Sequence, residues 1–218
     1  MTPDKRLAEV RRLYHQMHQD DSPPQTTRER QDAVVLARIR QMGLNLLMQG
    51  VTPRILELAL FYQWVRVSAL LQGLSEAQCD AWTADMGALM TPVVGLLKAL
   101  EPTLPDTGPT PTMHTLSTHV QQLKNLVQTL EARPVAQADL LRHTDLTNRT
   151  AFGVVGGLLD AQIHPGLITT VLLYYWLRMS TINANVPEVF FQKLERHWER
   201  VIPQVEAWVA ARAKQGRR

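Results

Sequence analysis

The amino-acid sequence predicts an all-helical fold. Apolar residues recur at helical spacing through almost the whole chain, and the alternation of apolar and polar residues that marks a half-buried strand is nearly absent. The chain has 218 residues, of which 45% are hydrophobic and 20% charged, as in an ordinary globular protein with a sizeable core. Its single cysteine, Cys79, excludes a scaffold held together by internal disulfides.

The first two helices are predicted from the residues at their ends. Pro3 can begin a helix that covers residues 3–19, because the missing N–H of proline costs nothing in the first turn. Thr26 or Thr27 caps a second helix, since a threonine hydroxyl can accept a hydrogen bond from a first-turn amide. Gly50 closes that helix, because glycine readily adopts the left-handed conformation that often follows a helix.

A third helix is predicted to begin at Thr52, whose hydroxyl caps it, and Pro53, and to end at Gly73. It is apolar almost all round, which predicts a central and buried position. Residues 75–78 then have the sequence Ser-Glu-Ala-Gln, a capping box that begins a fourth helix. Pro92 should kink or split this fourth helix, because proline removes a backbone hydrogen bond.

The second half of the chain repeats the first half after a proline-rich linker at residues 101–114. A shift of 112 residues aligns Gly50–Gln72 with residues 162–184 and gives six identities in 23 positions. The identical pairs are Pro53 with Pro165, Leu60 with Leu172, Tyr62 with Tyr174, Trp64 with Trp176, Arg66 with Arg178 and Ser68 with Ser180. This number is well above chance, so we predict a tandem duplication.

The duplication predicts four helices in each repeat and about eight helices in all. The first repeat covers residues 1–100 and the second covers residues 115–218. We expect the two repeats to pack into one globular unit with pseudo-two-fold symmetry. The third helix is too apolar to be half exposed, which favours close packing of the repeats over two separate domains.

The repeated pattern Tyr-x-Trp-x-Arg-x-Ser is the most specific feature of the sequence, and it has two interpretations. In the functional interpretation, the two copies of the pattern form a duplicated partner-binding site that consists of Tyr62, Arg66, Tyr174 and Arg178. Its planar guanidinium groups bind an anion or a carboxylate of another protein. In the architectural one, which we favour, the aromatic rings fill the core and each buried arginine needs an acidic partner.

No catalytic, cofactor-binding or metal-binding constellation emerges from the sequence. Phosphate-binding glycine loops, nucleophile elbows and zinc-protease motifs are absent from it. His15 and His18 share one helix face, but a zinc site needs three or four ligands. Asp160 and His164 have the spacing of an orienting pair for a general base, and His164 also has the position of a helix N-cap. We therefore expect no enzymatic activity, no metal and no cofactor.

A mild positive charge permits contact with nucleic acid without requiring it, since the formal net charge is +3. Basic residues gather in the second helix and in the C-terminal tail, where they could meet a phosphate backbone. These candidate nucleic-acid-binding residues are Arg28, Arg30, Arg38 and Arg40 in the helix, and Arg212, Lys214, Arg217 and Arg218 in the tail.

The sequence favours a non-enzymatic helical module that binds another protein, as an adaptor or regulatory protein, or that self-associates. Two repeated bundles present two similar grooves, which suit the recognition of a helix. The alternative is a basic accessory protein for DNA or RNA, and a third hypothesis is a helical-bundle enzyme with a site between the repeats. The chain starts with charged residues and has no long uncharged apolar run, so we expect a cytoplasmic protein without membrane insertion.

Overall fold

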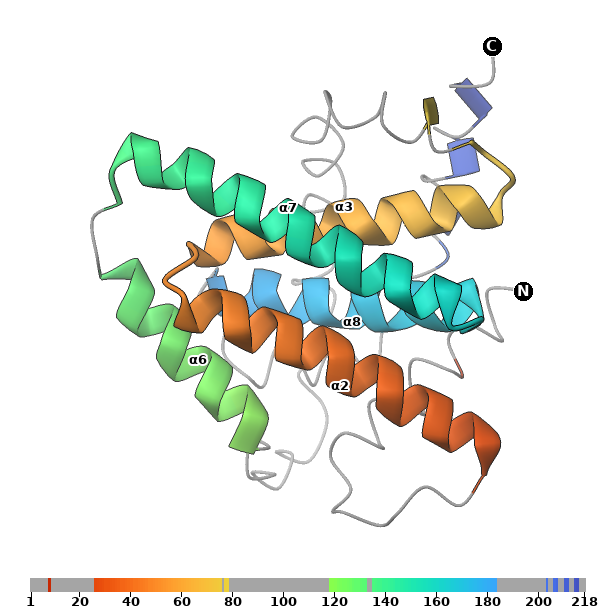
Figure 1. Ribbon diagram of the computed structural model, residues 1–218, viewed down its shortest axis with the longest axis horizontal. Coiled ribbons are helices and arrows are strands. Elements are labelled where there is room, and N and C mark those ends of the chain that lie inside the picture. Colours follow the sequence, from red (N-terminus) through yellow and green to blue (C-terminus); the bar gives the residue numbers. More distant parts are fainter. Residues whose placement is uncertain are drawn as a thin grey trace, which may run out of the picture.

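The computed structural model describes residues 26–75, 77–78, 118–132 and 135–183, together with isolated positions at 8, 203, 206, 207, 210, 211, 214 and 215. The described residues form helices and no strand, which confirms the predicted all-helical class. The helices, shown in Figure 1, are α2 (Thr27–Met48), α3 (Pro53–Leu71), α6 (Thr118–Glu131), α7 (Gln137–Asp160) and α8 (Pro165–Asn183).

The predicted architecture of eight helices in two repeats is not supported by this count, because the described residues contain five helices. The other predicted elements fall almost wholly outside the described residues. They are the helix at residues 3–19, the fourth helix with Pro92, the linker at residues 101–114, and the last helix of the second repeat.

The helices begin at residues whose side chains satisfy first-turn amides. Thr26 and Glu29 form a capping box, in which the threonine Oγ1 accepts from the Glu29 N–H at 3.1 Å and the glutamate Oε2 accepts from the Thr26 N–H at 3.1 Å. The predicted capping box at Ser75 is confirmed, since its N–H donates to Gln78 Oε1 at 2.9 Å. At the start of α8, His164 Nδ1 accepts from the N–H two residues later at 3.0 Å, which confirms it as the N-cap.

The turn between α2 and α3 and the turn between α7 and α8 have the same geometry. In the first turn, the Val51 N–H donates to the Leu46 carbonyl at 3.0 Å, and the equivalent bond 112 residues later is 3.1 Å long. Gly50 and Gln162 occupy equivalent positions with φ angles of 82° and 58°. Both turns are Schellman motifs, which need one residue in the left-handed conformation. Gln162 adopts that conformation although it is not glycine.

Replacing Gln162 with glycine is expected to stabilise the protein. A left-handed conformation costs an L-residue about 1 kcal/mol that glycine does not incur, partly offset by the greater backbone entropy of glycine when unfolded. We expect Q162G to raise the free energy of unfolding in urea by about 0.5 kcal/mol, and the reverse change G50Q to lower it by about 1 kcal/mol. Among the described residues, no atom lies within 4 Å of a Cβ built at Gly50, so any loss of stability in G50Q reports the cost of the backbone conformation. Equal stability of G50Q and the unchanged protein would therefore contradict this account.

Helices α3 and α8 form the centre of the bundle and cross each other as an antiparallel pair. Most residues of each helix are buried, and α2, α6 and α7 pack around them. Trp64 and Trp176 stack at the crossing, with ring centroids 5.8 Å apart and planes inclined by 6°. The Phe61 ring packs against both indoles, 5.5 Å from Trp64 and 5.0 Å from Trp176. The predicted central position of the third helix is therefore confirmed.

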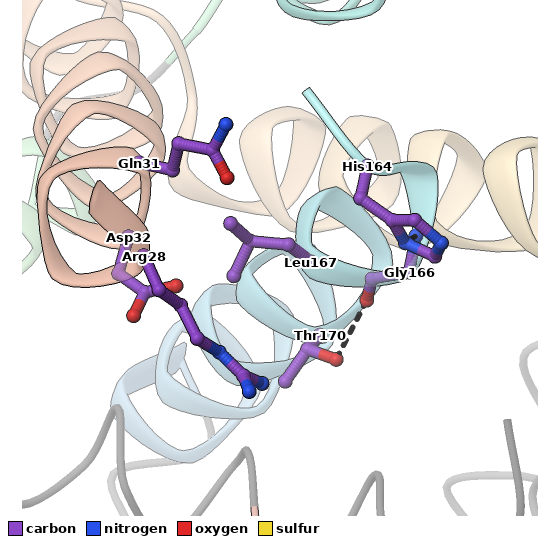
Figure 2. A pocket seen from close by; sticks show the side chains of 7 residues that line it. All are labelled: Arg28, Gln31, Asp32, His164, Gly166, Leu167 and Thr170. Atoms are coloured by element: carbon purple, nitrogen blue, oxygen red, sulfur yellow. Dashed lines mark hydrogen bonds between the residues drawn. The ribbon is translucent and has the colours of Figure 1, made fainter. Parts of the chain in front are cut away.

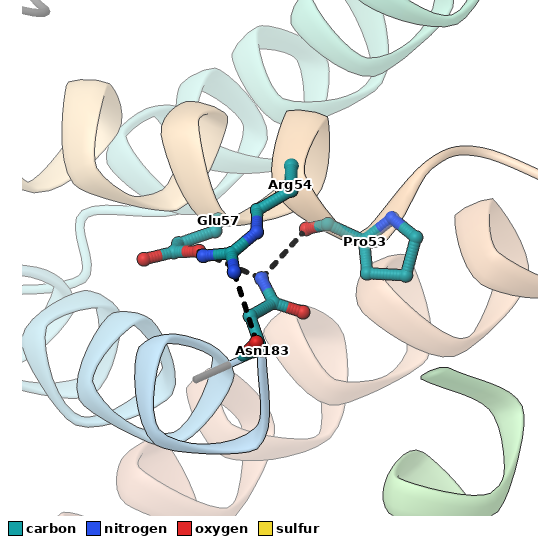
Figure 3. A network of polar contacts seen from close by, with 4 residues as sticks. All are labelled: Pro53, Arg54, Glu57 and Asn183. Atoms are coloured by element: carbon teal, nitrogen blue, oxygen red, sulfur yellow. Dashed lines mark hydrogen bonds and ion pairs between the residues drawn. The ribbon is translucent and has the colours of Figure 1, made fainter. Parts of the chain in front are cut away.

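A buried polar network ties the start of α3 to the end of α8 (Figure 3). The Glu57 carboxylate, which is 2% exposed, accepts from Asn183 Nδ2 at 2.7 Å and from Arg54 Nη1 at 3.3 Å. Arg54 Nη2 donates to the Asn183 carbonyl at 2.9 Å, and Asn183 Nδ2 also reaches the Pro53 carbonyl at 3.3 Å. The network fixes the antiparallel register of the two central helices at this end of the bundle.

Candidate functional site

The first copy of the repeated motif lies in the core and joins α3 to α7. Tyr62 and Arg66 are buried, and Arg66 is the more exposed of the two at 7%. The Arg66 guanidinium lies 4.5 Å from the centroid of the Phe152 ring, and the Tyr62 ring packs against the same ring at 5.6 Å. A cation placed over an aromatic face is attracted by the ring, so Phe152 stabilises the buried arginine.

The second copy of the motif holds its arginine differently. Arg178 Nε donates to the Tyr174 Oη one turn earlier on α8, at 3.2 Å. Burial raises the pKa of the adjacent Tyr175 above its ordinary value, and Tyr174 adds to this rise while Arg40 and Arg178 oppose it. The Tyr175 hydroxyl therefore keeps its proton to a higher pH than an exposed tyrosine does.

These contacts support the architectural interpretation of the motif. A partner cannot reach Tyr62, Arg66, Tyr174 or Arg178 without opening the bundle, because all of them are buried. The partner-binding role of these residues stays a prediction. Glu57, the acid available on the same helix as Arg66, instead bonds to Arg54 and Asn183.

A cavity of about 300 Å³ lies between the first turns of α2 and α8 (Figure 2). Its chemistry is mixed, because a cation, a carboxylate, an amide, an imidazole and a hydroxyl meet there. The lining residues are Arg28, Gln31, Asp32, His164, Gly166, Leu167 and Thr170. In Figure 2, the Arg28 side chain extends toward Thr170 and Leu167 points from α8 toward α2. We name this space the α2–α8 cavity.

Sequence reasoning did not identify the α2–α8 cavity. It assigned Arg28 to a nucleic-acid surface and His164 to capping or a catalytic pair with Asp160, and it did not single out Gln31 or Asp32. The two walls come from helices more than a hundred residues apart in the sequence. No local spacing relates such residues, so only the packing of α2 against α8 brings them together.

At the other end of the bundle, the positions that correspond to Gln31 and His164 contact each other directly. The 112-residue shift relates Gln31 to His143 and His164 to Thr52. Thr52 Oγ1 and His143 Nδ1 lie 3.3 Å apart, joining the start of α3 to α7. The predicted hydroxyl cap at Thr52 is therefore wrong: the residue is the N-cap, but its side chain makes no cap bond.

Three large apolar side chains are exposed near helix ends, one at the end of α2 and two near the start of α7. Figure 1 shows these two helix ends on the same side of the bundle. Leu140 lies on the same helical face as the buried Thr147 and Leu158, yet it is 37% exposed, near the start of α7. Leu141 is 72% exposed and Met48 is 73% exposed. We name these three residues the exposed apolar end.

The arginines of α2 are all exposed, and three of them lie on the solvent-facing half of the helix. At about 100° per residue, Arg28, Arg30, Arg38 and Arg40 lie at about 0°, 200°, 280° and 120° around the helix axis. Arg38 and Arg40 lie about 80° to either side of Arg30 on the solvent-facing half of the helix, and Arg28 lines the α2–α8 cavity. In the tail, Lys214 is exposed, and Arg212, Arg217 and Arg218 lie outside the described residues. Nucleic-acid binding stays a prediction.

No group of three or more histidine, cysteine, aspartate or glutamate side chains that could hold a metal occurs in the part of the chain that the structure describes. His15, His18 and Cys79 lie outside that part. Among the helices that it contains, none has the length and apolar character needed to span a bilayer.

Comparisons with protein-family models, with curated proteins and with solved structures find no match to this chain. Its function therefore has to be inferred from its own residues and their geometry.

Proposed function

We propose that the protein is a non-enzymatic helical module that binds another protein through the exposed apolar end. The observation that carries this proposal is the exposure of Met48 and Leu141 to more than 70% at one end of the bundle. Contiguous exposed apolar patches commonly mark interaction sites, and we propose that these side chains belong to one. The buried motif residues are less suited to this role, because a partner cannot reach them.

The exposed start of α7 has the features of a helix that enters an apolar groove. Leu140 extends the stripe of residues that packs into the core further along α7. In the first turns of α7 this stripe is exposed, so a partner can reach it. Asp145 and Arg149 form an exposed ion pair at 2.8 Å beside this segment. Charged neighbours of this kind keep an apolar helix face soluble until a partner covers it.

We further propose that the chain consists of two helical repeats, residues 1–100 and 115–218, related by a pseudo-two-fold axis near Trp64 and Trp176. The matching turns support this, as does the stacking of the two equivalent tryptophans. The contacts between the proposed repeats are also reciprocal: α2 of the first repeat packs against α8 of the second, and α3 of the first packs against α7 of the second. A two-fold axis that relates the repeats requires such reciprocal contacts. Four helices in each repeat would complete the predicted eight.

The test is capture of partners by the full-length protein from cells of its own source, with the double variant M48E/L141E. Two charges on the exposed apolar end should abolish capture, because burying them against an apolar groove is strongly unfavourable. The matched control is V34E, since Val34 is 47% exposed on the outward face of α2, away from that end.

Sedimentation velocity of the same variants distinguishes a different partner from a second copy of this chain. Circular dichroism melts should stay unchanged, because all the altered side chains face solvent. If M48E/L141E captures the same proteins as V34E and sediments identically to the unchanged chain, the exposed apolar end is not the binding surface.

A further inference from the structure

We propose that the outward face of α2 binds double-stranded DNA along the major groove. Arg38 and Arg40 contact phosphates of opposite strands, and Arg30 lies over the groove between them. We name these three residues the α2 basic face. The proposal does not depend on the protein-binding function of the exposed apolar end. Three features of α2 carry it: the sign of its exposed charges, the placement of its arginines, and the polar groups between them.

The first feature is that the exposed charges of α2 are all positive. The three arginines of the α2 basic face are exposed, and among the described residues no carboxylate forms an ion pair with them. Neither acid of the helix is exposed, because Asp32 is buried and Glu29 is half-buried and bonded to the Thr26 N–H in the capping box. A helix surface with one sign of charge attracts a polyanion such as nucleic acid.

The helices that pack against α2 leave this positive charge largely uncompensated. Helix α8 contains no acidic residue, and Glu57 of α3 is buried. The exposed side chains that the structure describes on α6 are neutral: Gln122, Asn125, Gln128 and Thr129. Among the described residues of these neighbours, exposed acids therefore occur only on α7, where Asp145 is paired with Arg149.

The second feature is the placement of the arginines around and along the helix. Arg38 and Arg40 lie about 80° to either side of Arg30, so each flank of the outward face carries a cation. The rise along the axis from Arg30 to Arg40 is about 15 Å. An α-helix with its side chains is about 10–12 Å across, and the major groove of DNA is about 12 Å wide. A helix in this groove has one phosphate backbone along each flank, which is where Arg38 and Arg40 lie.

The third feature is the pair of amide side chains between the arginines. Gln41 and Asn45 lie at angles between those of Arg30 and Arg38, and Gln41 Nε2 donates to Asn45 Oδ1 at 2.6 Å. This bond leaves the Gln41 oxygen and the Asn45 amino group for the edges of bases, which amide side chains bind in the major groove.

Double-stranded RNA and a membrane surface fit the α2 basic face less well. The major groove of double-stranded RNA is deep and narrow, and it does not admit a helix. A helix that lies in a membrane surface needs a broad apolar face. Apart from Met48 at its end, the one large apolar side chain that α2 exposes is Val34.

The experiment is a fluorescence-anisotropy titration of a labelled DNA duplex with the full-length protein, at salt concentrations from about 50 to 200 mM. We expect a dissociation constant of about 100 μM or tighter at the lowest salt concentration. The logarithm of the binding constant should fall with the logarithm of the salt concentration with a slope of about −2, because each neutralised phosphate contributes about −0.9. An RNA duplex of the same length should bind about tenfold more weakly or less.

Three variants and a control locate the surface. R38Q and R40Q should each weaken DNA binding about tenfold at the lowest salt concentration and make the slope less negative by about 1. V34E should weaken binding as much, because residue 34 lies one turn from both Arg30 and Arg38 and its carboxylate can pair with either. The matched control is R142Q, which removes an equally exposed arginine from α7 and should leave binding unchanged.

Four outcomes would overturn the proposal. The first is an absence of DNA binding at about 500 μM protein and about 50 mM salt. The second is equal weakening by R142Q and R38Q, which would mean that net charge governs binding. The third is tighter binding of the RNA duplex, or of vesicles with about 30% phosphatidylserine, than of DNA. The fourth is loss of binding in R217Q/R218Q with R38Q unaffected, which would assign the contact to the C-terminal tail.

Discussion

Substitution of Trp176 by alanine is expected to lower the free energy of unfolding by about 3–5 kcal/mol. The indole is fully buried, stacked on Trp64 and packed against Phe61, so its removal leaves a large cavity at the crossing of α3 and α8. Changes of this type cost about 3–5 kcal/mol, while a whole domain is stable by only about 5–15 kcal/mol. By the proposed two-fold relation, W64A should cost a similar amount.

Urea denaturation followed by far-ultraviolet circular dichroism measures this loss. W176F keeps an aromatic ring in the core and should cost less, about 1–2 kcal/mol. The control V34A alters a half-exposed side chain and should change the free energy of unfolding by less than about 0.5 kcal/mol. A W176A protein within about 1 kcal/mol of the unchanged chain would mean that the two tryptophans are not the centre of the core.

Replacement of Asn183 by alanine is the second large effect that the structure predicts. The buried Glu57 carboxylate would lose its shortest hydrogen bond, at 2.7 Å, and keep Arg54 at 3.3 Å. Hydrogen bonds to charged groups contribute about 1.5–3 kcal/mol, and a buried charge with too few partners is costly. We expect N183A to lower the free energy of unfolding by about 2–3 kcal/mol.

The double variant E57M/N183A separates a charge effect from simple loss of packing. With the carboxylate removed, no buried charge lacks a partner, so the double variant should be more stable than N183A by about 1 kcal/mol or more. R149A, which breaks the exposed Arg149–Asp145 pair, is the matched control and should cost less than about 0.5 kcal/mol. If E57M makes N183A less stable still, Glu57 contributes through packing and not through its charge.

Local features of the sequence predicted the helix boundaries well. The second helix was expected from Thr26 or Thr27 to Gln49 and is found at Thr27–Met48, and the third helix begins at Pro53 as expected. Caps and terminal glycines act over three or four residues, so they can be recognised without knowledge of the partner helices. The same holds for the capping box at Ser75 and for the N-cap at His164.

Features that depend on contacts between helices were predicted less well. The hydroxyl of Thr52 was expected to cap its own helix and instead contacts His143 on α7. Here a short-range pattern had a plausible local meaning that long-range packing replaced.

Gln63 illustrates the same limit of local patterns within the core. It lies in the apolar third helix and is fully buried, and among the residues that the structure describes neither its amide nitrogen nor its amide oxygen has a hydrogen-bond partner. A buried amide without partners is unfavourable by about 1–3 kcal/mol. The sequence shows one polar residue among apolar neighbours and cannot show whether that residue meets solvent.

The sequence by itself determined the helical class, the ends of the central helices and the equivalence of Gly50–Gln72 with residues 162–184, because periodicity, caps and internal similarity are properties of the chain alone. Only the tertiary structure decided that the repeated arginines are buried, that Glu57 bonds to Asn183, and that Arg28 and Asp32 share a cavity with His164. Those arrangements depend on which helix faces meet, and the meeting of faces from distant segments is fixed by packing of the whole core.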